Sequence, residues 1–552
     1  MMKNKRLKRW LTQMGGLATA ALLTLCNASY SMAQSAEDKA CGMLKFVDFS
    51  QLENGDAATS ITSATYVRDQ SLSEQDQLMT YKYSILMAAP VDRHVEKLPA
   101  HCNVEGYISP TIRFQIRLPA QENWNQRFLL SACDGFCGAV QTHRTMAGLV
   151  RNYATLTHDG GHSGIGFDGK WAKSNLQGKI DFAYRANHVL AVAAKAIIAS
   201  YYGESEEYSI IAGCSKGGQA GVMAAQRYPQ DFDGVIARGP TINYTKVNLI
   251  NCMDNAKAVL DENDMPIMDA SYAGFIHDSA VAACDALDGV TDGVIDDPRR
   301  CEFDPKSLSC EVNDHEKCLT EAQVDTVTQL YAASYDSQGN ELYGGLPIGS
   351  EIEWPWWVMP IPGSPMKPVH YYAATEYMKY VAYPNESGID NWRDFSYEQE
   401  KARLTEITPL MDADNPDLRE FRDSGGKMIV LHGWSDAAIP AHASIKWYED
   451  VMQFMGGVEA TQDFAQMYLL PGVTHCGYDA TGPNVMDGMA VLEKWMAEKQ
   501  APEYIVATKK DAKDMAVMRT KPIYPYPMQA TYKGSGDISK ASSYRLKQPQ
   551  AD

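Results

Sequence analysis

The chain has 552 residues, a formal net charge of −19 and a pI near 5.1. This length exceeds what one compact core usually holds, so we expect one large domain with a long insertion, or two domains. The acidic charge argues against nucleic acid or anionic membranes as partners, whereas an apolar content of 45% is ordinary for a globular protein.

Residues 1–33 have the pattern of an export signal peptide. Basic residues lie between Lys3 and Arg9, residues 15–26 form a short apolar run, and Ser31-Met32-Ala33 is a small-x-small cleavage motif. The apolar run is short for a membrane span, and no later stretch is long and apolar enough to be one. We therefore expect a secreted or periplasmic protein whose mature chain has no transmembrane segment.

The chain contains 12 cysteines, and removal of the signal would take Cys26 with it. In an exported protein, cysteines at this number indicate disulfides rather than a thiolate metal site. The odd number that remains predicts at least one unpaired thiol.

Strands and helices are predicted to alternate in two stretches, which indicates a mostly parallel α/β sheet. In chain order we expect strands at 111–119 and 127–133, a helix at 181–203, a strand at 208–213, a helix at 217–229, a strand from 427, a helix at 443–457, a strand from 466 and a helix at 485–499. Between these stretches, residues 246–423 are rich in Cys, Asp, Pro and aromatic residues and lack this rhythm. We interpret them as an inserted lid domain between two parts of one core, residues 34–245 and 424–552.

The turn between the strand at 208–213 and the next helix carries Gly213-Cys214-Ser215-Lys216-Gly217. A G-x-S-x-G motif between a strand and a helix predicts a nucleophile elbow, in which the serine hydroxyl stands above the sheet. The alternative is a glycine-rich turn with an incidental serine. In this context we predict that Ser215 is a catalytic nucleophile of an α/β-hydrolase core.

An α/β-hydrolase places its acid and its histidine later in the chain, in that order. Asp436 follows one predicted strand and His475 follows the next, so both lie on loops at the carboxyl ends of strands. His475 would accept the proton of Ser215, and Asp436 would orient the imidazole. An N-cap role for Asp436 and a surface-loop role for His475 are the alternatives. The competing residues, which combine order and context less well, are His158, His162, His432, His442 and Asp479.

Two cysteines flank this predicted triad, Cys214 before the serine and Cys476 after the histidine. If Ser215 and His475 touch, their neighbours are close enough to form a disulfide that would hold the two catalytic loops in register. Two unrelated cysteines are the alternative.

The segments "GCSKGG", "WSD" and "THC" resemble the Cys-Ser…Asp…His-Cys pattern of the tannase and feruloyl esterase family, which includes mono(2-hydroxyethyl) terephthalate hydrolases. The resemblance extends over the mature chain through "DFAYRANH", "AQRYPQDFDGVIARGP" and "PYPMQATYKGSGD". It implies a secreted serine esterase with an α/β-hydrolase core and a large lid, the triad Ser215, Asp436 and His475, and a Cys214–Cys476 disulfide.

An acidic loop in the predicted lid, between Cys284 and Cys301, carries Asp285, Asp288 and Asp292. Carboxylates on a tight glycine-bearing loop suit a hard cation such as calcium, although a solvated acidic turn has the same composition. The resemblance implies a structural calcium site that adds the carbonyls of Val290 and Val294. A Cys284–Cys301 disulfide would close the loop.

The oxyanion hole of such an enzyme needs two N–H donors. One is expected from Lys216, and the resemblance places the other in "ACDGFCG", at Cys133 or Asp134. We interpret the Asp134 side chain as a turn residue that points away from the oxyanion.

Three further disulfides are plausible, which leaves Cys252 as the odd thiol. The pairs are Cys133–Cys137, Cys41–Cys102 and Cys310–Cys318.

The aromatic residues of the lid, Trp357 and Trp392 among them, are numerous enough to sandwich an aromatic acyl group. Arg393 would suit a substrate carboxylate, as a terephthalate monoester demands. Core packing is the simpler interpretation of the aromatic residues, and a salt bridge is the simpler one for Arg393.

The leading functional hypothesis is a secreted serine carboxylic-ester hydrolase that acts on small aromatic acid esters, feruloyl or other hydroxycinnamoyl first and galloyl next. The alternative with the same mechanism is a mono(2-hydroxyethyl) terephthalate-type hydrolase. Two hypotheses without catalysis are a binding protein on a hydrolase scaffold and a calcium-dependent carbohydrate-binding protein. The sequence leaves the oligomeric state open.

Overall fold

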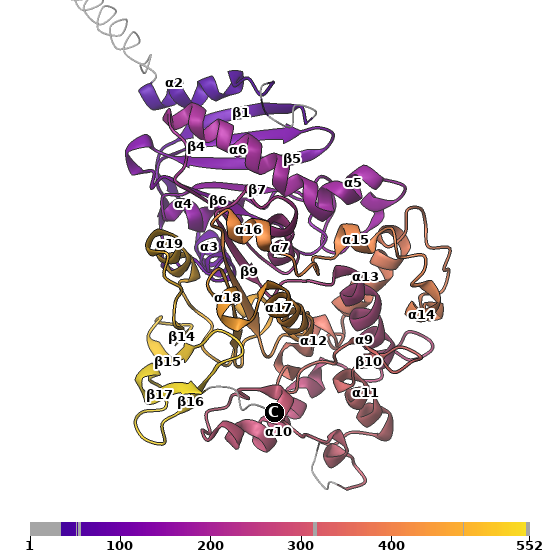
Figure 1. Cartoon of the computed structure of the whole chain (residues 1–552). Helices are drawn as coiled ribbons and strands as arrows, with labels where there is room; N and C mark the ends of the chain where they lie inside the picture. Colours follow the sequence, from indigo (N-terminus) through magenta and orange to yellow (C-terminus); the bar gives the residue numbers. More distant parts are fainter. Residues whose placement is uncertain (1–34, 51, 53–56, 313–316, 479, 548–552) are drawn as a thin grey trace, which may run out of the picture.

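A nine-stranded mixed sheet forms the centre of the computed structural model (Figure 1). The structure describes residues 35–50, 52, 57–312, 317–478 and 480–547, so the predicted export signal lies outside the described residues. The strand order is β1-β4-β5-β7-β6-β8-β9-β12-β13. These strands are β1 Thr59–Val67, β4 His101–Ile108, β5 Ile112–Pro119, β6 Arg127–Ser131, β7 Ala154–His158, β8 Tyr208–Cys214, β9 Gly234–Arg238, β12 Lys427–Gly433 and β13 Ala465–Leu470.

The expected parallel sheet is present, with an antiparallel edge that sequence patterns did not indicate. Strands β7, β6, β8, β9, β12 and β13 pair in parallel, whereas β1, β4, β5 and β7 pair antiparallel. The strands of the parallel part are buried on both faces, and β8 and β12 consequently consist of nearly continuous apolar runs.

Helices cover both faces of this sheet. Ile211 and Val430 point to the face that packs with helices α6 Ala186–Tyr202, α7 Lys216–Arg227 and α17 His442–Met455. Ile210 and Leu431 point to the opposite face, which packs with α3 Glu74–Leu86, α4 Met146–Val150 and α19 Gly488–Glu498. This alternation of side chains along each strand produces the three-layer arrangement of an α/β-hydrolase-type fold.

The chain between β9 and β12, which we call the lid (residues 246–423), contributes no described strand to the central sheet. It forms a separate apolar core that also takes in Phe136, Phe182 and Ala437–Ile439 from the central domain. Its helices are α9 Cys252–Val259, α10 Ala273–Cys284, α11 Glu321–Tyr331, α12 Trp354–Trp357, α13 Val369–Glu376, α14 Tyr397–Glu400, α15 Thr408–Met411 and α16 Arg419–Asp423, with a hairpin of β10 Ser334–Tyr335 and β11 Glu341–Tyr343. The lid therefore packs on the edge of the sheet where the turn after β6 and the loop after β12 lie.

Smaller elements complete the chain. They are α2 Ala36–Met43, β2 Gln70–Ser71, β3 Lys97–Leu98, α5 Leu176–Ile180, α8 Tyr244–Lys246 and α18 Val458–Gln462. The last segment forms two hairpins apart from the central sheet, β14 Ile505–Lys510 with β15 Val517–Ile523 and β16 Gln529–Tyr532 with β17 Tyr544–Lys547. Within the described residues, no helix combines the length and apolarity needed to cross a bilayer.

Candidate active site

Ser215 lies at a sharp turn between β8 and α7, where its φ is 61° and its ψ is −125°. A non-glycine residue with positive φ is strained, and it persists only where the surroundings hold it. Here the Ser215 N–H donates to Arg238 O at 2.9 Å, and Ser215 O accepts from Gln219 N–H at 3.0 Å. The turn therefore has the backbone geometry of a nucleophile elbow.

The glycines of the G-x-S-x-G motif allow this turn to form. A Cβ on Gly213 would lie 2.6 Å from the carbonyl carbon of Gly217, which is closer than real atoms approach. A Cβ on Gly217 would lie 3.0 Å from Ala132 O, so the start of α7 also packs directly on the turn after β6. Larger side chains at either position would displace the serine from its place above the sheet.

Asp436 and His475 form a buried pair on the loops after β12 and β13. His475 Nδ1 lies 2.8 Å from Asp436 Oδ2, and Asp436 Oδ1 accepts the Ile439 N–H at 2.8 Å. Because Nδ1 faces a carboxylate, it carries the ring proton, and Nε2 is left as the basic nitrogen. Burial acts to raise the pKa of Asp436, but the charges of His475 and His432 outweigh it and hold the pKa below its ordinary value.

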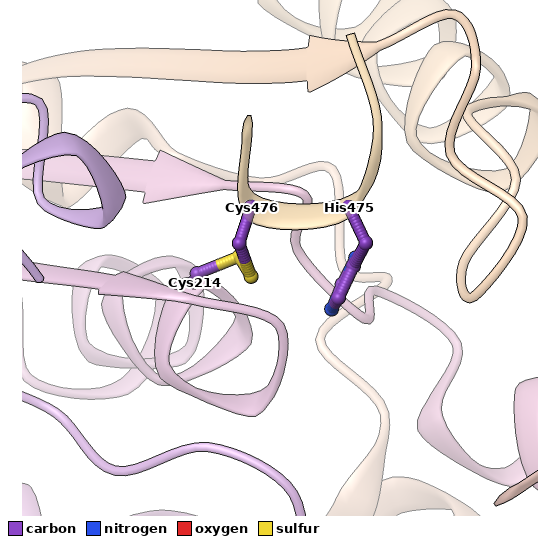
Figure 2. A group of neighbouring side chains, drawn as sticks. All are labelled: Cys214, His475 and Cys476. Atoms are coloured by element: carbon purple, nitrogen blue, oxygen red, sulfur yellow. A yellow bond between two sulfur atoms is a disulfide. The ribbon is translucent and has the colours of Figure 1, made fainter. Parts of the chain in front are cut away.

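The Cys214–Cys476 disulfide connects the serine turn to the histidine loop (Figure 2). The two Cα atoms lie 5.7 Å apart across a sequence separation of 262 residues. Figure 2 shows the bridge on one side of the His475 loop, with the imidazole projecting from the other end of the same short turn. His475 and the two sulfurs form a close cluster of potential metal-binding groups, but both sulfurs are bonded to each other and offer no thiolate.

Ser215 and His475 both line a cavity of about 540 Å³ between the central domain and the lid. Aromatic side chains form much of its wall, namely Phe167, Trp356, Trp357 and Tyr478. Trp357 meets the His475 ring edge to face at a centroid distance of 5.4 Å. A smaller inner cavity of about 30 Å³ shares Ser215, His475 and Trp357 with it and extends towards Cys252 and His370.

A strained serine, an oriented imidazole and a shared aromatic-walled cavity are the parts of a hydrolase site. The profile of the "Tannase and feruloyl esterase" family matches residues 96–546 of this chain. The chain belongs to the tannase and feruloyl esterase family. It is accordingly a carboxylic ester hydrolase of this type.

Two similar curated proteins and one solved structure illustrate the relationship. An uncharacterized esterase of Xanthomonas campestris pv. campestris is 30% identical over 501 residues, covering 83% of this chain and 86% of that protein. The mono(2-hydroxyethyl) terephthalate hydrolase of Piscinibacter sakaiensis is 29% identical over 538 residues, with 84% and 87% covered. The crystal structure of feruloyl esterase B from Aspergillus oryzae superposes with a TM-score of 0.76 at 24% identity, over 93% of this chain and all of that one.

The turn that was expected to complete the oxyanion hole of this esterase lies against the start of α7. Cys133 and Cys137 are joined by a disulfide within this turn, and Asp134 and Gly135 line the catalytic cavity. The Asp134 carboxylate forms an ion pair with the guanidinium of Arg144, which is itself buried. Arg144 therefore neutralises the charge of Asp134. Which backbone N–H, that of Cys133 or that of Asp134, contributes to the oxyanion hole stays a prediction.

Lys216, whose N–H is the first expected donor, has a buried side chain. Its Nζ donates to Gln219 Oε1 at 2.7 Å and to Ala183 O at 3.3 Å. Burial lowers the pKa of Lys216 to about 7. The side chain is thus occupied, and an oxyanion role for the backbone N–H, at the first position of α7, stays a prediction.

The structure does not bring Trp392 and Arg393 to the catalytic cavity. Arg393 forms an ion pair with Asp264 and donates to Leu260 O, and the Trp392 ring is buried with its Nε1 at 3.4 Å from Asp264. Neither residue is among those that line the cavity, whereas Trp357 is. Trp392 therefore packs in the core of the lid, and Arg393 forms a salt bridge, as the simpler interpretations of both residues had it.

The acidic loop of the lid curls around the side chain of Asp285. Its carboxylate accepts N–H groups from Asp292, Gly293 and Val294, and the Cys284–Cys301 disulfide closes the loop. Sequence patterns missed two cations that reach this loop from β15. Arg519 Nη1 donates to Asp292 Oδ2 at 2.8 Å, and Lys521 pairs with Asp296.

The remaining expected disulfides, Cys41–Cys102 and Cys310–Cys318, are also formed. Cys252 has no disulfide partner among the described residues and lies buried in the wall of the inner cavity. Burial raises the pKa of its thiol above the ordinary value.

Sequence patterns also missed Gly239 and Glu353 at the site. Gly239 has a φ of 46°, and a Cβ there would lie 3.2 Å from Asp436 Oδ2 and 3.4 Å from His475 Nδ1. The Gly-Pro pair after β9 is a turn signal that would have marked this position. Glu353 reaches the two catalytic loops from the lid, and no local motif identifies it.

Proposed function

We propose that this chain is an exported serine esterase that hydrolyses aromatic acid esters through an acyl-enzyme. Feruloyl and other hydroxycinnamoyl esters are the first expected substrates, and galloyl esters the next. The observation that carries the proposal is the buried His475–Asp436 pair at 2.8 Å, which shares a cavity with the strained Ser215. With the ring proton on Nδ1, His475 Nε2 would be the nitrogen that accepts the proton of Ser215.

The proposed reaction has two halves. His475 Nε2 takes the proton of Ser215 Oγ as this oxygen attacks the ester carbonyl, and the Lys216 N–H with a second amide from Cys133 or Asp134 stabilises the oxyanion. Collapse expels the alcohol, which receives the proton from His475. Water then loses a proton to His475 and attacks the acyl-serine, and release of the carboxylic acid restores the serine hydroxyl.

The charge of the cavity supports an uncharged aromatic acyl group. Two carboxylates, Asp134 and Glu353, lie in its wall together with the aromatic rings, and none of its described lining residues is Lys or Arg. A terephthalate monoester would bring a second carboxylate into this wall without a cationic partner, which is unfavourable. We therefore rank hydroxycinnamoyl and galloyl esters above the terephthalate-type substrate, despite the similarity to a hydrolase of that name.

The test is hydrolysis of methyl ferulate, methyl gallate, mono(2-hydroxyethyl) terephthalate and p-nitrophenyl acetate by wild type and Ser215→Ala. We expect cleavage of at least one aromatic ester by wild type, loss of at least about 10³-fold in the variant, and fluorophosphonate labelling that requires Ser215. A folded wild type that cleaves none of the esters, or an active Ser215→Ala, would refute the proposal and favour a binding role.

We also propose that the acidic loop holds a structural calcium ion. The candidate ligands are the carboxylates of Asp285, Asp288 and Asp292 and the carbonyls of Val290 and Val294. Burial and the nearby Asp296 charge raise the pKa of Asp288 to about 7. A divalent cation bound here would relieve the repulsion between the two carboxylates. The pairing of Asp292 with Arg519 would compete with such an ion, so its binding should strengthen when this ion pair is removed.

Export is the third part of the proposal. Five disulfides join described cysteines, which is typical of proteins that mature outside the cytoplasm. N-terminal sequencing of the protein recovered from the periplasm or the medium tests it, since the expected first residue is Gln34. A mature chain that still begins at Met1 would contradict it.

A further inference from the structure

Glu353 connects the lid to both loops that carry the His475–Asp436 pair. Its Oε1 accepts the backbone N–H of His475 at 2.8 Å, and its Oε2 accepts the backbone N–H of Ala437, the residue after Asp436, at 2.8 Å. One carboxylate thus holds two loops that follow different strands of the central sheet. It also lies in the wall of the cavity that contains Ser215.

The lid holds Glu353 firmly in place. Glu353 is the last residue of the 3-10 helix Glu351–Glu353, and Glu351 at its start is buried. The Glu351 carboxylate accepts from Tyr331 OH at 2.6 Å and lies 3.0 Å from His277 Nδ1, which ties the turn to α11 and α10. The next residue, Trp354, is buried and donates from Nε1 to Ser350 Oγ at 3.1 Å.

We propose that Glu353 is a positioning residue for catalysis, which sets the separation and orientation of His475 and Asp436 and adds negative charge beside the imidazole. The proposal rests on the catalytic roles proposed above for Ser215, Asp436 and His475. Two charge-assisted hydrogen bonds from one rigid carboxylate restrict both loops, and small displacements of such groups reduce rates steeply. The lid then completes the catalytic machinery as well as covering the substrate.

The other charged or titratable groups near His475 come from several elements. Among the described residues they include Asp436 after β12, His432 on β12, His370 on α13, and Arg238 at the end of β9, whose guanidinium lies against Gly477. Asp134 and Tyr478 line the same cavity as His475. Since Glu353→Gln changes none of these groups, a shift of the pH profile in this variant reports the charge of Glu353 itself. The imidazolium that forms during the reaction loses a nearby negative charge, so it should form less readily.

The experiment compares Glu353→Gln and Glu353→Ala with wild type in kcat, KM and the pH dependence of kcat/KM on methyl ferulate or the best ester of the panel. Glu376→Gln is the matched control, because Glu376 is also a lid carboxylate that accepts a backbone N–H of the central domain, that of Gly169 at 3.1 Å. Thermal unfolding of each variant reports changes in stability separately.

We expect Glu353→Ala to lower kcat by about 10- to 100-fold with KM within about threefold of wild type. Glu353→Gln keeps one acceptor oxygen and should lose about 3- to 10-fold, and in both variants the acid limb of the profile should move to lower pH by about half a unit or more. Glu376→Gln should match wild type in kcat and in the acid limb.

Two results would overturn the proposal: a kcat of Glu353→Ala within threefold of wild type, or an acid limb unchanged in both Glu353 variants. If Glu353→Ala does not fold, the Glu353→Gln profile decides alone. Ser215→Ala distinguishes a failure of this proposal from a failure of the proposed function. If Ser215→Ala is inactive while the Glu353 variants behave like wild type, only the role of Glu353 is refuted.

Discussion

Removal of the Cys214–Cys476 disulfide should reduce both stability and the rate of the chemical step. The bridge spans 262 residues, and in the chain-entropy model a closed loop of this length stabilises the folded state by about 5 to 6 kcal/mol. Cys214 adjoins the serine and Cys476 adjoins the histidine, so loss of the bridge also releases the two reacting groups from a common anchor. In Cys214→Ala/Cys476→Ala we therefore expect a loss of about 3 to 6 kcal/mol and a fall in kcat of about 10-fold or more.

Urea unfolding without reductant and steady-state hydrolysis of the best aromatic ester measure the two effects. The control is Cys310→Ala/Cys318→Ala, whose bridge spans 8 residues and is distant in sequence from the triad. The same model gives about 2 to 3 kcal/mol for it, and its kcat should be unchanged. The reasoning is refuted if the two double variants lose equal stability, or if the variant without Cys214–Cys476 retains wild-type kcat at temperatures where it is folded.

Three further changes test the substrate wall, the acidic loop and a buried carboxyl. Trp357→Ala should lower kcat/KM for methyl ferulate about 10-fold more than for p-nitrophenyl acetate, and equal effects on the two esters would contradict this expectation. Arg393→Ala, which loses the Asp264 pair and the bond to Leu260 O away from the cavity, should leave kcat/KM for both esters unchanged. A calcium chelator should lower the Tm of wild type by about 3–10 °C, and added Ca²⁺ should restore it. Asp288→Ala should abolish this response. An unchanged Tm of wild type in the chelator would exclude the calcium site. Burial raises the pKa of Asp412 to about 7. Between about pH 4 and 7 the folded state therefore keeps a proton that the unfolded state releases. The free energy of unfolding consequently falls as pH rises through this range. Asp412→Asn should therefore be more stable than wild type at pH 8, by about 2 to 4 kcal/mol, with no difference near pH 4; a constant difference at both pH values would show that titration is not the cause.

The turn at Ser215 was predictable because a nucleophile elbow is a local structure. Gly213, Ser215 and Gly217 lie within five residues, so the motif is visible in the sequence, and the structure shows why glycine is needed at the two flanking positions. Asp436 and His475 were predictable from chain order, since loops after parallel strands meet at one edge of the sheet. The structure places both residues at that edge.

The lid residues were not predictable in the same way. Trp357, Trp392 and Arg393 occur in similar aromatic, irregular segments, yet only Trp357 reaches the catalytic cavity. Asp264, which neutralises Arg393, lies 129 residues away in sequence. A pairing over such a distance leaves no periodic pattern by which a substrate arginine could be told from a structural one.

The sequence by itself determined the alternating core, the elbow at Ser215, the order of Ser215, Asp436 and His475 and the two flanking cysteines. Each of these depends on short-range sterics or on the order of elements along the chain. The tertiary structure alone decided the antiparallel edge of the sheet, the partners of Asp134 and Asp292, the wall of the cavity and the contacts of Glu353 with the two catalytic loops. Those features depend on side chains that become neighbours only when segments far apart in the chain pack together, and no local pattern encodes that packing.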